Sequence, residues 1–173
     1  STSGIKGVSG LGGLLNKISS SGLENPLREY KIEYKDKSIN SIFSEFINIL
    51  SPNANTKEEV AGRDALIETL TELYELLETT GEDITYFDNL DDSKFNFIMN
   101  KYIENYVFAK FLNDLEYRAE KYAKSIESVI QKEKDIKDFI NFSVNNATKD
   151  INFKNFNYND LDAIEKIYRD CYK

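Results

Sequence analysis

A chain of 173 residues with a formal net charge of −8 has the length of one domain plus an extension. The acidic excess disfavours direct binding of nucleic acid, which needs clustered Lys and Arg. The sequence has no His, which excludes His-based catalytic and metal sites, and its single cysteine, Cys171, excludes an internal disulfide. We expect Cys171 to be one more apolar residue of a terminal helix.

The sequence carries no signal for a membrane or for export. It has no run of 18 apolar residues, so no membrane span is predicted. Glycines interrupt the apolar residues near the N-terminus, which is unlike a signal peptide. We therefore expect a cytoplasmic protein. The only methionine is Met99, so we expect that a segment upstream of Ser1 was removed or was left out of this chain.

Residues 1–22, STSGIKGVSGLGGLLNKISSSG, differ in composition from everything that follows. They hold six of the eight glycines, no aromatic residue and no carboxylate. Their two lysines give them a charge of +2, against −10 for residues 23–173. Each glycine inside a helix costs about 1 kcal/mol relative to alanine. The composition therefore predicts a Gly/Ser-rich, extended and flexible tail over residues 1–22, followed by a helical domain over residues 23–173.

Apolar residues nevertheless recur in the tail at mostly three-residue spacing, which a simple linker does not need. Two interpretations stay open. The tail is either a flexible linker or a segment that orders along a groove, of a partner or of its own body, at some entropic cost. The second interpretation predicts that tail residues make the contacts with a partner. The candidate partner-binding residues are Ser1, Thr2, Ser3, Gly4, Ile5, Gly7, Val8, Gly10, Leu11, Gly12, Gly13, Leu14, Leu15 and Ile18.

The start of the body predicts two helices. Asn25 as the N-cap and Pro26 at the first helical position indicate a short helix. Ser38 is expected to cap an amphipathic helix, in which apolar residues recur at the i, i+3, i+4 spacing of a core-facing stripe. The pair Ser51-Pro52 should end this helix, because proline disfavours helical backbone in the residue before it.

A capping box predicts the start of the next helix. The Thr56 side chain can accept from a backbone N–H in the first turn, while Glu59 reaches back to the N-cap backbone. Apolar periodicity then continues until Gly81, which is typical of a helix C-terminus. Gly62 lies inside this helix and weakens it, so we expect close packing against a neighbouring element there.

Aromatic residues dominate the third long helix, which Asp92 or Ser93 should cap. Its wide apolar arc predicts that it is the central helix of the fold. The sequence leaves its end open. The helix either breaks after Asn113-Asp114 or continues through Tyr122.

Two further helices complete the prediction. Residues 125–147 show helical apolar periodicity, and residues 150–158 form an Asn/Phe-rich connector. Asn159 is expected to cap the final helix. About five helices with short joints predict an all-α helical bundle carrying the N-terminal tail.

The glycines of the tail do not complete a nucleotide-binding motif. Gly7 and Gly12 have the spacing of a phosphate-binding loop, but Gly13 stands where the lysine belongs. Asp150-Ile151-Asn152 begins like a calcium loop, yet Leu161 occupies the position of the bidentate glutamate. We therefore predict no metal site and no cofactor.

Asp64 and Glu68 share a helix face, with Arg63 beside them. Such a carboxylate pair can perform acid–base chemistry if burial separates the two pKa values, but an acidic helix often places it on a solvated face. Arg63 would then anchor a buried ion pair that fixes helix packing. We assign a structural role to these three residues. We predict no catalytic residue and no enzymatic activity, because no acid–base constellation is evident.

Four short patterns follow one another in the body. They are an S-I-x-x-I-F helix start at 38–43, an S/C-P-x-x-x-T connection at 51–56, an A-x-R-x-A pattern followed by E-T at 61–69, and an N-D-[IL] helix end at 113–115. In this order and spacing they resemble the QatB family of Qat anti-phage defence systems, over roughly half of the body. The chain departs from the family at Phe108 and Lys110, where the resemblance leads us to expect an acidic residue and an arginine.

The resemblance implies an accessory protein of bacterial defence. Qat systems also encode an ATPase, a QueC-like enzyme and a TatD-like nuclease, and the resemblance implies that the QueC-like enzyme joins a deazaguanine base to an exposed N-terminal glycine of a protein. This chain would then be the substrate. Its helical body would dock on the QueC-like (QatC-like) partner while its N-terminal tail enters the active site. The alternative is a structural adaptor whose tail tethers it to another component, such as the ATPase.

Overall fold

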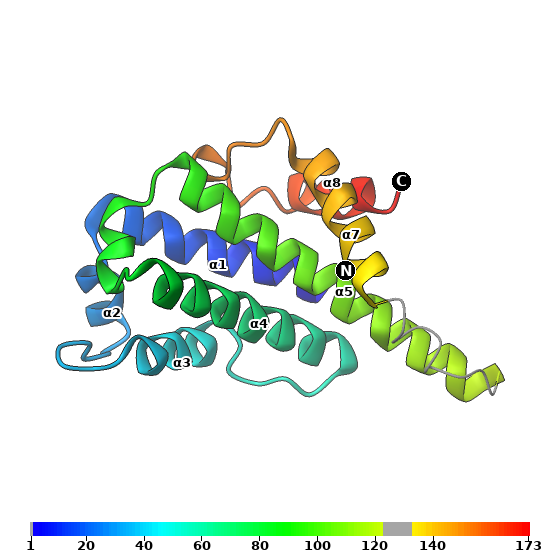
Figure 1. Cartoon of the computed structure of the whole chain (residues 1–173), viewed down its shortest axis with the longest axis horizontal. Coiled ribbons are helices and arrows are strands. Elements are labelled where there is room, and N and C mark those ends of the chain that lie inside the picture. The colour runs from blue at the N-terminus through cyan, green and yellow to red at the C-terminus, as the bar shows by residue number, and fades with distance from the viewer. Residues whose placement is uncertain (1, 123–132) are drawn as a thin grey trace.

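The computed structural model describes the backbone of residues 2–122 and 133–173, and the side chains of residues 2–115 and 133–173. Within this part the chain is all-helical, as predicted (Figure 1). The α-helices are α1 Thr2–Ser21, α2 Glu24–Glu29, α3 Ile39–Leu50, α4 Lys57–Thr80, α5 Asp92–Tyr122, α7 Glu133–Thr148 and α8 Leu161–Cys171. Two 3₁₀ helices, η1 Ile84–Asn89 and η2 Phe153–Asn155, lie in the connections.

The prediction of an extended, flexible tail was wrong for residues 2–21, which form helix α1. This helix contacts α2, α3, α4, α5 and α8 as well as both 3₁₀ helices, so most of the fold is built around it. In Figure 1 it runs along α4 and α5 through the middle of the molecule. The interpretation that the segment orders in a groove of its own body is the one that the structure supports.

Helix α1 forms because burial outweighs the weak helix propensity of its glycines. Five glycines inside it cost roughly 5 kcal/mol relative to alanine. Complete burial of one aliphatic side chain contributes about 1.5–3 kcal/mol, and α1 buries five of them. These are Val8, Leu11, Leu14, Leu15 and Ile18, each at most 5% exposed. Gly22, at a φ of 80°, then ends the helix in a left-handed conformation.

The predicted ends of α3 and α4 are confirmed. Ser38 accepts a hydrogen bond from the backbone N–H of Ser41, and α3 ends at Leu50, before the serine-proline pair. The capping box of α4 has both of its bonds, one to the side chain of Thr56 and one to that of Glu59. Gly81 adopts a φ of 70° at the C-terminal end of α4, which only glycine reaches without strain.

Three helix starts differ slightly from their predicted caps. Helix α5 is capped by Asp91, whose side chain accepts from the Lys94 N–H at 2.8 Å, rather than by the two residues that follow. Helix α8 is capped by Asp160, one residue after the predicted asparagine. In α2 the side chain of Asn25 gives no N-cap and donates to the Ser21 carbonyl instead. Aspartate and asparagine are about equally good N-caps. Where several of them are neighbours in the sequence, the backbone conformation decides which one becomes the cap.

Helix α5 continues to Tyr122, the longer of the two predicted alternatives. It packs most extensively against α4 and also contacts α1, α7 and η2, which agrees with a central position. The predicted helix over residues 125–147 is described from Glu133 to Thr148, and residues 125–132 lie outside the described residues. Helices α7 and α8 pack on one another beside α1 and α5. Cys171 on α8 is buried, as predicted, and burial raises the pKa of its thiol to about 11.

Candidate functional site

Glycines of α1 lie directly under tyrosine rings. A Cβ atom added at Gly7 would lie 1.7 Å from the hydroxyl oxygen of Tyr102, and one at Gly12 would lie 2.1 Å from the ring of Tyr158. No side chain tolerates such distances, so the rings can approach the α1 backbone only where a Cβ is absent. The glycines therefore serve close packing inside the chain.

The N-terminal end of α1 is held by side chains from three other helices. Glu58 on α4 accepts hydrogen bonds from the backbone N–H of Ser3, at 3.4 Å, and from the hydroxyl of Tyr106, at 3.3 Å. A carboxylate in this position also interacts favourably with the helix dipole. Tyr168 on α8 donates to the Gly4 carbonyl at 3.0 Å. Burial raises the pKa of Tyr168 well above its usual range, so this hydroxyl remains a donor at any physiological pH.

Most of the candidate partner-binding residues face the interior of the chain. Buried positions are Gly4, Val8, Leu11, Gly12, Leu14, Leu15 and Ile18. Partly buried positions are Ser3, Ile5, Gly7, Gly10 and Gly13. Thr2 is exposed, and Ser1 lies outside the described residues. While this fold persists, a partner can reach α1 only through its exposed and partly buried positions.

A cavity of about 210 Å³ opens beside the N-terminal half of α1. It lies between α1, the connection from α3 to α4, and the first turns of α4. Lys6, Pro52 and Asn53 line it at exposed positions, and Tyr102 lines it from the buried core. Here candidate residues of α1 adjoin open space together with Tyr102 of α5.

Arg63 ties the start of α4 to the end of α3. Its guanidinium donates a hydrogen bond to the carbonyl oxygen of Ser51. Among the ion pairs of the described residues none involves Arg63, so its packing contact is this hydrogen bond and not the predicted buried ion pair. Asp64 and Glu68 are exposed and line a groove between α4, α5 and α7.

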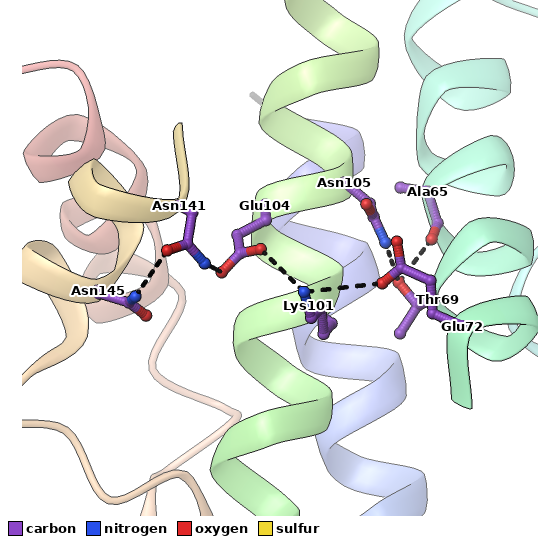
Figure 2. Close-up of polar contacts among 8 residues, drawn as sticks. All are labelled: Ala65, Thr69, Glu72, Lys101, Glu104, Asn105, Asn141 and Asn145. Atoms are coloured by element: carbon purple, nitrogen blue, oxygen red, sulfur yellow. Dashed lines mark hydrogen bonds and ion pairs between the residues drawn. The ribbon is translucent and has the colours of Figure 1, made fainter. Parts of the chain in front are cut away.

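A polar network joins α4, α5 and α7 (Figure 2). Lys101 on α5 lies 4.0 Å from Glu72 of α4 and 3.6 Å from Glu104 of its own helix. Glu104 accepts a hydrogen bond of 2.8 Å from the side-chain amide of Asn141 on α7. Asn145, one turn further along α7, donates to Asn141. The network crosses three helices that are distant in sequence, so it fixes their mutual register.

Glu72 is the least well satisfied member of this network. Its Oε2 atom is buried and has no hydrogen-bond partner within the described residues. Burial raises the pKa of the Glu72 carboxyl, while the ammonium group of Lys101 opposes that shift. Beside it, Asn105 donates to Thr69, and Thr69 donates to the Ala65 carbonyl. The network therefore holds helices together while keeping one carboxyl in an unfavourable environment.

Two aromatic side chains stand out on the surface of α7. Phe139 and Phe142 are 69% and 70% exposed, whereas Ile140 and Val144 on the same helix are buried. Exposed aromatic side chains one turn apart are typical of surfaces that contact another protein. Within the described residues no group of three or more acidic or cysteine side chains is placed to hold a metal ion, and no helix there is long and apolar enough to cross a membrane.

The residues that hold α1 were not among those predicted from the sequence. Tyr102 and Tyr106 are four residues apart and so share one face of α5, while Gly4 and Gly7 are three apart and share one face of α1. This complementarity of small and large residues was present in the sequence. It becomes visible only when residues 2–21 are treated as a helix.

The fold and these surfaces define an acidic, all-helical protein whose N-terminal helix is built into its core. The chain belongs to the QatB family, the Qat anti-phage system associated protein QatB, whose family model matches residues 1–173. It is therefore a component of a Qat anti-phage defence system, and the resemblance found in its sequence is confirmed. No curated protein and no solved structure matches the chain.

Proposed function

We propose that this chain is a non-enzymatic, cytoplasmic component of its Qat system, which docks on the QueC-like enzyme and presents its N-terminal side for covalent modification. The observation that carries the proposal is the family match over residues 1–173. The helical body would provide the docking surface, and the N-terminal side would provide the substrate segment.

The packing of α1 changes which residues can be presented. Thr2 is exposed, whereas Gly4 is buried and its carbonyl accepts a hydrogen bond from Tyr168. A substrate segment would therefore consist of the first residues of the chain and of anything attached to them. Because α1 is fixed in the core, such a segment would project from a rigid point. Rigid attachment reduces the entropy lost when the segment enters an active site.

The exposed aromatic residues of α7 are the surface that we assign to docking. Phe139 and Phe142 offer a large apolar contact area, and aromatic residues are enriched at protein interfaces. They lie on a different helix from α1, so docking and presentation would use separate parts of the molecule.

Co-expression with the QueC-like enzyme of the same system tests the proposal. The expected results are co-purification and an increase in the mass of the N-terminal peptide in intact-protein and peptide mass spectrometry. An unmodified N-terminus together with no co-purification would refute it. The double variant Phe139→Ser and Phe142→Ser should lose co-purification with its thermal unfolding unchanged. Phe111→Ser, at an exposed aromatic residue of α5, serves as the matched control.

The second candidate function is a structural adaptor that joins another component, such as the system ATPase. The observation in its favour is that α1 contributes to the core, so the N-terminal segment has a structural role that needs no modification. Fusion of a small folded domain to the N-terminus separates the two functions. A substrate could no longer enter an active site and would lose defence activity, whereas an adaptor would keep its partner and its activity.

A further inference from the structure

The hydroxyl group of Tyr102 reaches the cavity beside α1 and has no hydrogen-bond partner among the described residues. Tyr102 is 1% exposed, and its oxygen lies against Gly7 and Gly62, both of which line the cavity. A Cβ atom added at Gly62 would lie 3.8 Å from that oxygen, so the hydroxyl sits between α1 and α4. Among the described residues no hydrogen bond to this hydroxyl is formed. Glu72 Oε2 is the one fully enclosed polar side-chain atom without a partner among the described residues, so the Tyr102 oxygen reaches the open space of the cavity, where a molecule bound there can accept its hydrogen bond.

Three other buried tyrosines near α1 show what is missing at Tyr102. The hydroxyl of Tyr106 donates to Glu58, that of Tyr158 to the Phe153 carbonyl at 2.6 Å, and that of Tyr168 to the backbone of α1. Each of these three is satisfied inside the protein. Among these four, Tyr102 alone lines this cavity, and burial raises the pKa of its phenol, which keeps it protonated.

The charges around the cavity cancel. Hydrogen bonds from the backbone N–H groups of Asn55 and Thr56 lower the pKa of Glu59, and the ammonium group of Lys6 adds to that shift. Both backbone bonds go to Oε2 of Glu59, at 2.9 and 3.2 Å, which leaves Oε1 for another donor. Lys6 and Glu59 both line the cavity with Ser3. The lining thus offers hydrogen-bond donors and acceptors with no net charge.

We propose that this cavity binds a neutral amide group, such as a carboxamide side chain or a peptide unit. An amide has one acceptor and at least one donor, which match the hydroxyl of Tyr102 and the free oxygen of Glu59. Because Lys6 and Glu59 carry opposite charges, neither a carboxylate nor an ammonium group gains a net attraction here, whereas a neutral amide can bond to both kinds of lining group. The volume of about 210 Å³ is below the roughly 300–1,000 Å³ of sites for drug-sized ligands, so it suits a group of side-chain size. The side chains of Leu50 and Leu66 would contact its methylene groups.

Three probes of equal size test this selectivity on the full chain. Propionamide, propionate and propylammonium are each titrated into the ¹⁵N-labelled protein and followed by NMR. We expect saturable shifts at the backbone amides of Gly7 and Gly62 with propionamide only. Shifts that never saturate, or that are equal for all three probes, would show that the cavity holds solvent and would overturn the proposal.

Two variants connect the binding to the named groups. Tyr102→Phe should weaken propionamide binding by about fivefold or more, the loss of one hydrogen bond, without lowering the unfolding temperature. Tyr106→Phe, whose hydroxyl bonds Glu58 instead, should leave propionamide binding unchanged. Lys6→Ala, at an exposed position, should let propylammonium bind, because Glu59 then lacks its counter-charge. Unaltered binding in Tyr102→Phe, or unaltered selectivity in Lys6→Ala, would contradict the proposal.

The source of the amide is distinguished by a second pair of probes. A capped Gly-Gln-Gly peptide is compared with capped Gly-Glu-Gly and with propionamide. Tighter binding of the glutamine peptide than of propionamide identifies the peptide of a partner protein as the ligand. Equal binding of those two identifies a small free amide. Binding of the glutamate peptide as tight as that of the glutamine peptide would refute selection for a neutral amide. These measurements use the isolated chain, so their outcome is independent of docking to the QueC-like enzyme.

Discussion

Adjacent glycines of α1 have opposite environments. The Cβ position of Gly12 is occupied by the ring of Tyr158, whereas that of Gly13 has no atom within 4 Å. The ring cannot move easily, because its hydroxyl bonds the Phe153 carbonyl at 2.6 Å and the carbonyl of Tyr158 accepts from Ser9. Two residues of the same type and the same helical conformation should therefore respond to substitution in opposite directions.

We predict that Gly12→Ala destabilises the protein and that Gly13→Ala stabilises it. Overpacking a well-filled core costs about 1–3 kcal/mol, which exceeds the gain of about 1 kcal/mol from replacing glycine in a helix. At Gly13 only that gain remains. Urea unfolding followed by circular dichroism measures both free energies of unfolding. Changes of the same sign would mean that the Tyr158 ring is not packed on α1 as described.

At the scale of elements, the sequence predicted what is encoded locally. The capping box of Thr56 and Glu59 and the helix end at Gly81 each depend on residues within one or two turns, and each was found as expected. Helix α1 was not predicted, because the reason for its glycines lies about 100 residues away, in the rings of α5. Propensity is a weak prior, and tertiary packing overrides it here.

The polar contacts of the candidate site also join residues that are distant in sequence, so they could not be predicted from it. The network of Glu72, Lys101 and Asn141 joins three helices, and no spacing within one helix reveals it. The partner of Arg63 proved to be a backbone carbonyl, Ser51, which has no signature in the sequence. The exposed Phe139 fits the apolar period of α7 as well as a core residue would, so its exposure could be recognised only from the packed fold.

Deletion of α1 tests whether residues 1–22 are part of the core or a flexible tail. We predict that deletion of residues 1–22 abolishes cooperative unfolding, because the burial of its five aliphatic side chains, roughly 8–15 kcal/mol, is similar to the whole stability of a domain, about 5–15 kcal/mol. A flexible tail would leave the thermal transition in place. Circular dichroism and scanning calorimetry distinguish the two outcomes.

Complementation supplies the control for this deletion. A synthetic peptide of residues 1–22 should restore a cooperative transition to the truncated chain, since it supplies the missing core. The same peptide with leucine at Gly7 and Gly12 should not restore it, because those positions are filled by Tyr102 and Tyr158. A truncated chain that unfolds cooperatively on its own would contradict the central place of α1.

The whole molecule carries a net charge of −8, and most of its carboxylates are at positions where water can reach them. Glu72 is partly exposed, but its Oε2 atom is buried and has no hydrogen-bond donor among the described residues. The ammonium nitrogen of Lys101 lies 4.0 Å from the Glu72 carboxylate, and the same ammonium group also pairs with Glu104. The acidic character that keeps the surface hydrated therefore also extends into the junction where α7 joins the rest of the fold.

We predict that Glu72→Gln raises stability at neutral pH and that this gain disappears in acid. The folded-state pKa of Glu72 lies above its ordinary value of 4.5, because burial disfavours the charged form. Below pH 4.5 the carboxyl is protonated in both states and resembles glutamine, so the two proteins should be equally stable. As pH rises from 4.5 through the folded-state pKa, the wild type loses stability relative to the variant, and the difference then stays constant. Urea unfolding between pH 4 and pH 8 measures it, with Glu75→Gln at an exposed position of α4 as the control. A difference that grows in acid would reverse the sign and would mean that Glu72 stabilises the fold as a carboxylate.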